Sequence, residues 1–254
     1  AFIGLLWFFI PNNLCAIFIE GNLARSLSMI FLPVFIYSVY KYLYNHKLRY
    51  IPLMVFTFLL MELCHLGYAG MVAIAVIIYG IVYIIQKGRK KAVLDVVISM
   101  IFGFMLLGIW LVASLRGGIT SLDNSENMAN FFQNLWITIN PFERLTRGFE
   151  YFYFGFAALV VIVFGILFGY KKSRTGFVTG FIILLMTTKS AYAVLKHLPG
   201  SQYLWMLRFI SIALCMILMS FLMWDRLKKT LVLMLCVLLV VDTIPSLSLI
   251  VGEH

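Results

Sequence analysis

The chain has 254 residues, of which 63% are hydrophobic and only 12% are charged. Apolar runs long enough to cross a bilayer recur along it. The composition therefore excludes an ordinary soluble domain and predicts an all-α, polytopic transmembrane helical bundle. The formal net charge of +10 does not indicate a nucleic-acid partner. The basic residues cluster in short loops between the apolar runs, as they do in cytoplasmic loops of membrane proteins.

The chain begins inside an apolar run. Residues 1–10 would cover about 15 Å as a helix, half of a hydrocarbon core of roughly 30 Å. We therefore expect this run to be the tail of a helix that starts before Ala1. A short linker follows, and the next helix, predicted at 26–44, ends in a basic loop that we place in the cytoplasm.

The next apolar stretch, residues 51–85, has basic flanks on both sides. A single helix cannot start and end on the same side of a membrane, so we predict two short helices, at 51–64 and 68–85. They meet at a tip that contains Glu62 and His65. The first helix spans only about 21 Å at 1.5 Å per residue. We therefore expect the tip to stop below the outer surface, inside the protein.

The second half of the chain alternates in the same way. Residues 86–91 form the strongest cytoplasmic loop, and a helix at 93–115 leads to a long polar segment at 116–150. We predict this segment to be an outer-face loop with a helix lying in the interface. Further helices are predicted at 151–170, 176–189, 205–224 and 230–250.

These crossings predict one transmembrane domain over residues 1–254, with about eight membrane helices plus the partial first one. Most of the Lys and Arg residues fall in the four short loops placed inside. Two glycine pairs, Gly165/Gly169 and Gly176/Gly180, have the GxxxG spacing that permits close helix packing. We interpret both as ordinary transmembrane glycines. The cysteines have no metal-binding or disulfide spacing, and we interpret Cys64 and Cys215 as small membrane-core residues.

The unusual polar residues gather on the predicted outer side of the membrane. Among them, Arg208 is predicted about one turn inside the helix at 205–224, and Trp205 is the first residue of that helix. An ionisable residue there is costly, so it is by default a functional-site hypothesis. The alternative is that Arg208 reaches the lipid head groups and only anchors the helix.

A polar cluster at one membrane face, ringed by aromatic residues, suits an amphipathic, lipid-linked substrate. Arg binds phosphate with two parallel hydrogen bonds, and a carboxylate or His can take a proton from an acceptor hydroxyl. Our catalytic candidates are Glu62 and His65, which would share one helix face. Two ligands do not make a metal site, so for this pair we favour a structural hydrogen bond. No cofactor is predicted, and a divalent metal is left open. The substrate-binding candidates are Asn22, Arg25, His197, Arg208 and Asp242.

Three segments together resemble one group of proteins. Gly21-Asn22-Leu23-Ala24-Arg25 resembles the "GNLPR" opening of bacterial multispanning proteins that carry the 6-pyruvoyl-tetrahydropterin synthase-related membrane domain, with Ala24 in place of the usual Pro. The tip at 62–67 is similar to that group's "sH" tip. Residues 199–209 resemble its "P…lqfpWRF" segment, with an extra residue between Trp and Arg, and residues 241–246 fit its last helix. The group's name is a historical label and implies no pterin chemistry.

Such proteins resemble GT-C glycosyltransferases and the membrane proteins of lipoteichoic-acid glycosylation. The resemblance implies a GT-C-like fold in a bacterial plasma membrane. It also implies transfer of a sugar from a polyprenyl-phosphate donor to a cell-envelope acceptor at the outer face, with membrane lipid as a further partner. In GT-C enzymes the catalytic acid usually lies in the first outer loop, after the first helix. The resemblance places that loop before Ala1, so we expect residues 1–254 alone not to transfer sugar.

Two other classes of protein remain as alternatives. One is a transporter or flippase for a lipid-linked or anionic substrate, and the other is a non-catalytic membrane scaffold. A transporter would show inverted repeats and helices broken at the middle of the membrane. Here the polar residues lie at one face and no internal repeat is visible, which favours the enzyme.

Overall fold

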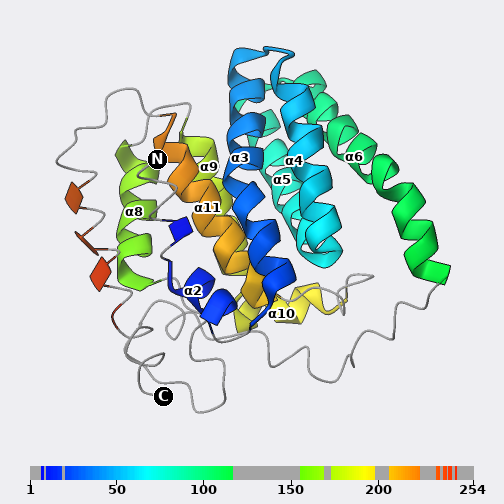
Figure 1. Ribbon diagram of the computed structural model, residues 1–254. Helices are drawn as coiled ribbons and strands as arrows, with labels where there is room; N and C mark the ends of the chain where they lie inside the picture. Colours follow the sequence, from blue (N-terminus) through cyan, green and yellow to red (C-terminus); the bar gives the residue numbers. More distant parts are fainter. Residues whose placement is uncertain are drawn as a thin grey trace.

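Figure 1 shows a computed structural model of the chain. It describes residues 7–8, 10–18, 21–116, 155–168, 173–197 and 206–223, and isolated positions between 233 and 244. These residues form helices and no β-strand, which confirms the all-α prediction for the part of the chain that is described. The helix predicted at 230–250 and nearly all of the outer-face loop predicted at 116–150 lie outside the described residues, apart from isolated positions.

Between residues 23 and 116 the helices follow one another with short connections. In chain order the described helices are α2 (Pro11–Phe18), α3 (Leu23–Asn45), α4 (Tyr50–Cys64), α5 (Leu66–Lys87), α6 (Lys90–Arg116), α8 (Gly155–Phe168), α9 (Arg174–Met186), α10 (Lys189–Leu195), the 3-10 turn η3 (Met206–Arg208) and α11 (Phe209–Phe221). The longer helices match the predicted ranges to within a few residues. Two short helices, α2 and α10, were not predicted.

The tip between α4 and α5 consists of a single residue, His65. Its backbone is extended, with φ −156° and ψ 93°, and its Nδ1 accepts a hydrogen bond of 3.0 Å from the backbone N–H of Tyr68. This bond satisfies one of the N–H groups that the first turn of a helix leaves without a partner. The structure thus confirms two short helices that meet at this point.

The helix ends gather at two ends of the bundle (Figure 1). The α3–α4 turn, the α5–α6 turn and the start of α9 lie together at what we call the basic end. There the Tyr44 hydroxyl lies 2.9 Å from Thr175 Oγ1, which donates to Gln86 Oε1 at 2.6 Å. The start of α3, the α4–α5 tip, α10 and η3 lie at the opposite end, which we call the polar end. The arrangement agrees with the alternation predicted from the charges.

Among the described residues, three helices are long and apolar enough to cross a membrane: Leu23–Asn45, Leu66–Lys87 and Lys90–Gly108. Shorter apolar helices occur at Tyr50–Cys64, Leu159–Phe168, Arg174–Met186 and Met206–Phe221. A 13-residue helix such as α11 covers only about 20 Å, less than a full hydrocarbon core. The described part of the chain therefore supports an all-α membrane protein but not the predicted count of eight spans.

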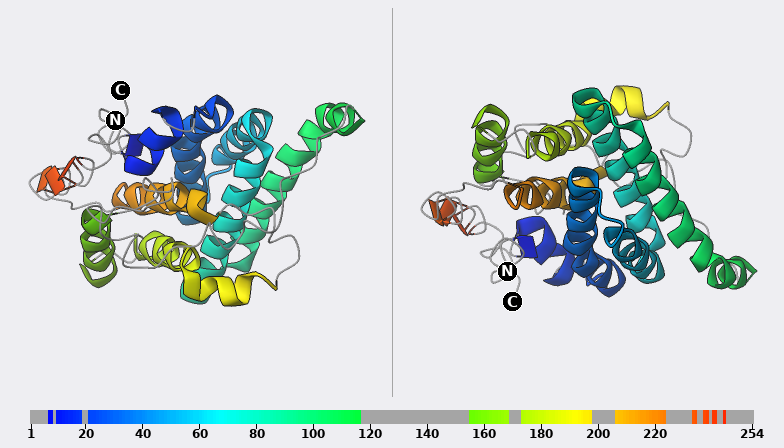
Figure 2. Two further views of the ribbon diagram at one scale, coloured as in Figure 1. Left: turned by 90° about the horizontal axis from the view of Figure 1, so that it is seen from below. Right: turned by 90° about the horizontal axis from the view of Figure 1, so that it is seen from above.

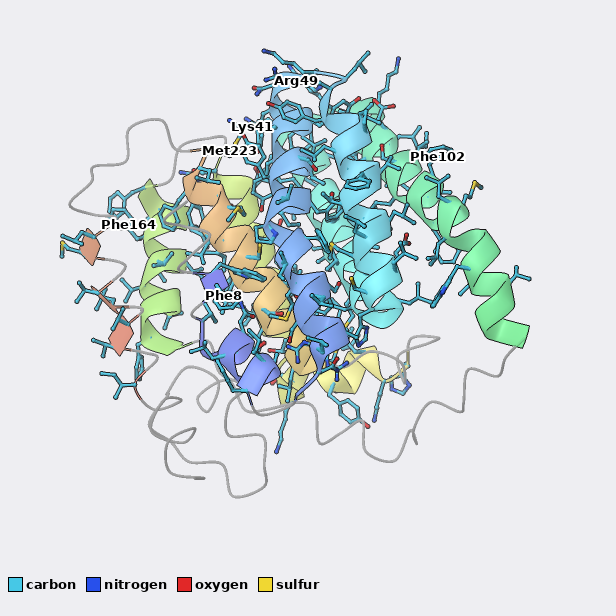
Figure 3. All side chains as sticks on the ribbon, in the orientation of Figure 1. Phe8, Lys41, Arg49, Phe102, Phe164 and Met223 are labelled. Atoms are coloured by element: carbon cyan, nitrogen blue, oxygen red, sulfur yellow. The ribbon has the colours of Figure 1, made fainter. Side chains whose placement is uncertain are left out.

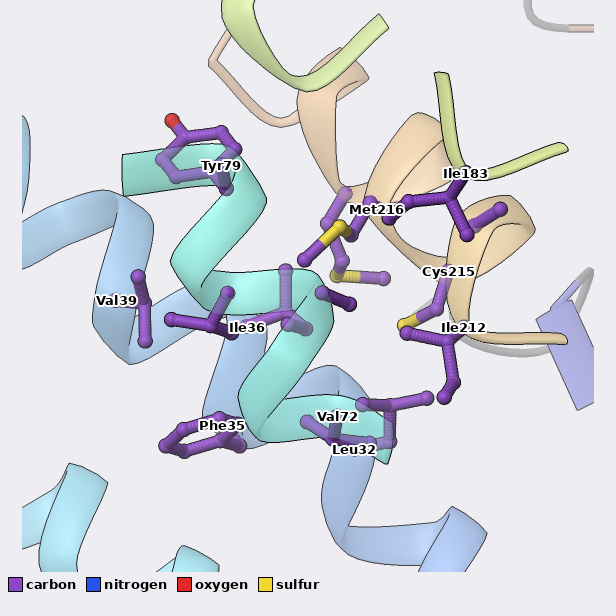
Figure 4. Close-up of a cluster of buried hydrophobic side chains, with 14 of the residues drawn as sticks. Leu32, Phe35, Ile36, Val39, Val72, Tyr79, Ile183, Ile212, Cys215 and Met216 are labelled. Carbon is purple, nitrogen blue, oxygen red and sulfur yellow. The ribbon is translucent and has the colours of Figure 1, made fainter. Parts of the chain in front are cut away.

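Helix α11 forms the centre of the bundle. Every residue from Phe209 to Phe221 is buried, as expected for a helix that is apolar on all sides. Figure 2 shows α11 between α2 and α3 on one side and α8 and α9 on the other, with α6 at the outer edge. Cys215 is fully buried in this core, beside Ile212 and Met216 (Figure 4), in agreement with its predicted role as a small core residue.

Helix α6 presents one apolar face outward, whereas Val96, Met100 and Leu107 on the same helix are buried. Ile98, Phe102 and Met105 are all exposed and recur at helical spacing, and Figure 3 shows Phe102 pointing away from the other helices. An apolar face of this width is costly in water but matches lipid tails. The exposed surface of α6 therefore agrees with a helix that faces the membrane.

The Gly176/Gly180 pair lies where α9 packs on α11. A Cβ added at Gly176 would overlap Ser220 Oγ and lie 2.7 Å from the Tyr40 hydroxyl. One added at Gly180 would lie 3.1 Å from the backbone oxygen of Ala213. Our interpretation of these residues as ordinary transmembrane glycines is therefore wrong for this pair. The two positions are one turn apart, so both face α11 and allow the two backbones to approach.

Candidate functional site

Arg25 is fully buried at the start of α3, at the polar end of the bundle. Asn22 caps this helix, because its Oδ1 accepts a hydrogen bond of 3.0 Å from the Arg25 backbone N–H. The guanidinium donates through Nη2 to Asn12 Oδ1 at 3.2 Å, and its carbon lies 6.0 Å from the centroid of the Tyr68 ring. Arg25 thereby joins α2, α3 and α5.

Tyr68 connects this arginine to the start of α11. The Tyr68 hydroxyl lies 3.0 Å from Ser211 Oγ, and Ser211 Oγ donates to the backbone oxygen of Arg208 at 2.9 Å. Because the single hydroxyl proton of Ser211 is used in that bond, Tyr68 is the donor to Ser211. Tyr68 is thus linked through Ser211 to the backbone of Arg208, while its ring faces the Arg25 guanidinium. Two segments whose arginines are 183 positions apart by their numbers therefore meet at one buried tyrosine.

We refer to this group as the Tyr68 cluster. Its members are Asn12, Asn22, Arg25, Tyr68, Arg208 and Ser211. The segment before α3 holds it from the other side: Trp7 Nε1 donates to the backbone oxygen of Ser211 at 3.3 Å, and Asn13 Nδ2 donates to the backbone oxygen of Trp7 at 2.6 Å. A buried amide or hydroxyl is costly unless it is hydrogen-bonded. These bonds therefore fix how the segment before α3, the start of α5 and the start of α11 are arranged.

Arg208 does not lie one turn inside a helix, as the sequence predicted. It is the last residue of the 3-10 turn η3, and α11 begins at the next residue, Phe209. Its side chain is half-buried, in contrast to the fully buried Arg25. The error arises because the apolar run that contains Arg208 does not show where α-helical hydrogen bonding begins. Trp205 lies outside the described residues.

Glu62 and His65 do not share a helix face. Glu62 lies within α4, whereas His65 follows the helix in extended conformation, so the i, i+3 relation of a helix does not apply to the pair. Glu62 is only 2% exposed, and its Oε2 has no hydrogen-bond partner among the described residues. This oxygen lies 3.7 Å from where a Cβ would stand on Gly103, so the carboxyl group is directed at α6.

The two remaining substrate-binding candidates are not in the Tyr68 cluster. His197 is exposed in the turn after α10, and among the described residues no hydrogen bond joins its side chain to the cluster. Asp242 lies outside the described residues. In the described part of the chain, no three His, Cys, Asp or Glu residues stand close enough together to hold a metal ion.

Sequence reasoning missed three members of the Tyr68 cluster: Asn12, Tyr68 and Ser211. A weak signal was present for Tyr68, because a tyrosine inside an apolar helix needs a partner for its hydroxyl when it is buried. Asn12 stands beside Asn13 in an otherwise apolar stretch, where a polar pair also needs partners. Ser211 carried no usable signal, since serine is common in membrane helices.

Chemically, the polar end combines two guanidinium groups, a phenol, an amide cap and the buried carboxyl group of Glu62, whose Oε2 has no hydrogen-bond partner among the described residues. Comparison with protein families finds a match over residues 1–250 to a model described as "6-pyruvoyl-tetrahydropterin synthase related domain; membrane protein". No match was found among curated proteins or among solved structures.

Proposed function

We propose that this chain acts on a polyprenyl-phosphate-linked sugar at the extracytoplasmic face of a bacterial plasma membrane. The chain belongs to the family of membrane proteins with a 6-pyruvoyl-tetrahydropterin synthase-related domain. In this proposal the protein is a GT-C-like glycosyltransferase. The bond between the sugar's anomeric carbon and the phosphate oxygen breaks, and polyprenyl phosphate leaves. The hydroxyl oxygen of a cell-envelope acceptor forms the new glycosidic bond and gives up its proton to a base.

The observation that supports this proposal is that Tyr68 links Arg25 to the segment that carries Arg208, at one end of a membrane bundle. Guanidinium groups present fork-shaped donors that match the oxygens of a phosphate. An interaction between charges is also stronger in a partly desolvated site than in water. The polar end therefore suits a ligand whose phosphate lies at the membrane surface and whose hydrocarbon chain lies in the bilayer.

We assign different roles to the two arginines. Arg208 is half-buried and can reach a ligand, so it contacts the donor phosphate directly. Arg25 is fully buried and bonded to Asn12, so it holds Tyr68 in place and adds positive charge behind the phosphate. Asn22 acts indirectly, because it caps the helix that positions Arg25. His197 and Asp242 stay proposals for contacts to the sugar.

The candidates for proton transfer also take different roles. His65 Nδ1 accepts the Tyr68 backbone N–H, which requires a neutral ring with its proton on Nε2. In this state His65 is a hydrogen-bond donor, suited to a sugar or acceptor oxygen rather than to base catalysis. Glu62 keeps an oxygen without a hydrogen-bond partner among the described residues, so it is the better candidate for the base.

A transfer assay tests the proposal. Because residues 1–254 alone are not expected to transfer sugar, the natural full-length protein that contains them would be purified into lipid nanodiscs. It would be supplied with a radiolabelled polyprenyl-phosphate sugar and an extract of cell-envelope acceptors. We expect the label to move onto an acceptor, and the transfer to depend on Arg208. In sealed vesicles, movement of the intact labelled lipid to the other leaflet without formation of a new glycosidic bond would identify a flippase and refute the proposal.

A further inference from the structure

A cavity of about 970 Å³ opens at the basic end of the bundle, opposite the Tyr68 cluster. It lies between the α3–α4 turn and the α5–α6 turn, near the side chain labelled Arg49 in Figure 3. Its lining residues are Tyr42, His46, Leu48, Ile51, Gly88, Arg89, Lys90, Lys91, Ala92 and Asp95. The volume is at the upper end of the range for small-molecule sites, so it exceeds what a lone inorganic anion would fill.

The charges around this cavity favour an anion. Arg89, Lys90 and Lys91 are exposed at its wall, and Asp95 is the acidic residue in the lining. Asp95 Oδ2 accepts a hydrogen bond of 2.6 Å from the Tyr42 hydroxyl, so part of the carboxylate is already engaged within the protein. Three bases against one acid leave the lining with net positive charge.

The two turns that frame the cavity are fixed by their backbones. His46 ends α3 with φ 52° and Gly88 ends α5 with φ 69°, both in the left-handed region that terminates helices. The Arg89 guanidinium contacts the His46 ring, which joins one turn to the other. The basic side chains are therefore presented by a framework that exists before any ligand binds, which lowers the entropic cost of binding.

Apolar side chains border the charged wall. Leu48 is 72% exposed although it stands in the lining between basic turns, and Ile51 lies next to it at the start of α4. On α6, Leu94 is also exposed just beyond the cavity. Basic groups next to exposed apolar groups, at the end of helices that cross a membrane, match the level where a lipid head group meets its acyl chains.

From these observations we infer that the cavity binds the phosphate head group of an anionic membrane phospholipid, with its glycerol and upper acyl chains against Leu48 and Ile51. Arg89 supplies a fork-shaped pair of donors to the phosphate, and Lys90 and Lys91 add charge. The exposed Leu48 favours a lipid over a free phosphate ion, because a soluble anion gains nothing from an apolar wall. This inference does not depend on the proposed function.

Lipid binding to the purified protein tests it. Phosphatidylglycerol would be titrated against the protein in neutral detergent and its binding followed by native mass spectrometry, with phosphatidylcholine as the zwitterionic comparison. We expect the combined variant Arg89→Gln, Lys90→Gln, Lys91→Gln to bind phosphatidylglycerol about 100-fold more weakly, since each base near a membrane surface contributes about a fivefold factor. Circular dichroism checks that the variant keeps its helices.

The matched control is the combined variant Arg174→Gln, Lys189→Gln, Lys196→Gln, which removes the same charge from three exposed positions that are not among the residues lining the cavity. It should retain most of the binding, and an equal loss in both variants would show unspecific attraction and overturn the inference. A second variant, Leu48→Ser, keeps every charge and should weaken the lipid several-fold. Displacement of the lipid by millimolar inorganic phosphate, at constant ionic strength, would identify a free-anion site instead.

Discussion

The guanidinium carbon of Arg25 lies 6.0 Å from the centroid of the Tyr68 ring, and the Tyr68 hydroxyl reaches Ser211, whose Oγ donates to the backbone of Arg208. One buried tyrosine thus links the Arg25 guanidinium to the backbone of the segment that carries Arg208. A substitution at Tyr68 therefore alters contacts to both segments. The consequences can be measured separately for stability, donor binding and transfer.

Replacing Tyr68 by Phe removes the hydroxyl while keeping the ring that faces Arg25. We expect the free energy of unfolding to fall by about 1 kcal/mol, because the bond between Tyr68 and Ser211 is lost in a buried place. Thermal unfolding in detergent measures the change. Tyr37→Phe serves as the control, since no hydrogen bond to the Tyr37 hydroxyl is found among the described residues. Equal melting temperatures for the two variants would contradict the prediction.

Replacing Arg208 by Lys keeps the positive charge but loses the planar fork. If Arg208 holds the donor phosphate, binding of a polyprenyl-phosphate sugar to the protein in nanodiscs should weaken about 10- to 100-fold, the cost of one charged hydrogen bond. Arg174→Lys, an exposed arginine at the basic end, should leave binding unchanged. Unaltered binding in Arg208→Lys, with normal expression, would favour the alternative that Arg208 only anchors the helix to lipid head groups.

Replacing Glu62 by Gln keeps the shape of the side chain and removes its capacity to accept a proton. Transfer should slow by about 10²- to 10⁴-fold if Glu62 is the base, while donor binding stays the same. The variant should be at least as stable as the parent, because a buried neutral amide has a lower desolvation cost than a carboxylate. Asp95→Asn, a carboxylate at the opposite end of the bundle, should not affect transfer. A full transfer rate in Glu62→Gln would remove Glu62 from the mechanism.

Replacing Gly176 by Ala should destabilise the bundle, because the added methyl group overlaps Ser220 and the Tyr40 hydroxyl where α9 meets α11. Forcing extra volume into a packed interior costs about 1–3 kcal/mol. Gly108→Ala is the matched control, since nothing lies within 4 Å of an added Cβ there and Ala favours the helix. The two melting temperatures should move apart, with Gly176→Ala lower. Similar values would mean that the helices are not closely packed at Gly176.

The orientation of the bundle in the membrane is a prediction from charge. Single cysteines at Lys90→Cys and Ser125→Cys, in a background without the four natural cysteines, would be probed on intact cells with an impermeant thiol reagent. We expect labelling at position 125 and not at 90, because short basic loops stay in the cytoplasm. The reverse pattern would place the Tyr68 cluster on the cytoplasmic side and exclude an extracytoplasmic reaction.

The helices themselves could be predicted from the sequence, because the length of an apolar run and the charges at its ends are local properties. The hairpin of α4 and α5 illustrates this. A run of about 35 residues between two basic loops on the same side of the membrane cannot be one crossing helix, so two helices are required. Helix α2 was missed because its eight residues, Pro11–Phe18, are too few for a periodic pattern to emerge. The start of α11 was misplaced for a related reason, because composition does not distinguish a 3-10 turn from the first turn of an α-helix.

The sequence by itself also determined that Arg25, His65 and Arg208 lie at the same end of the bundle, since counting the crossings between them is sufficient. Only the tertiary structure decided which of them meet. The partners Tyr68 and Ser211 are 143 positions apart, and the contact depends on how α5 and α11 are rotated about their axes. That rotation is set by packing, with Gly176 and Gly180 allowing α9 to approach α11. In an apolar chain, many rotations bury similar areas of side chain, so hydrophobicity alone does not select among them. The shapes of the packed side chains and the few buried hydrogen bonds do.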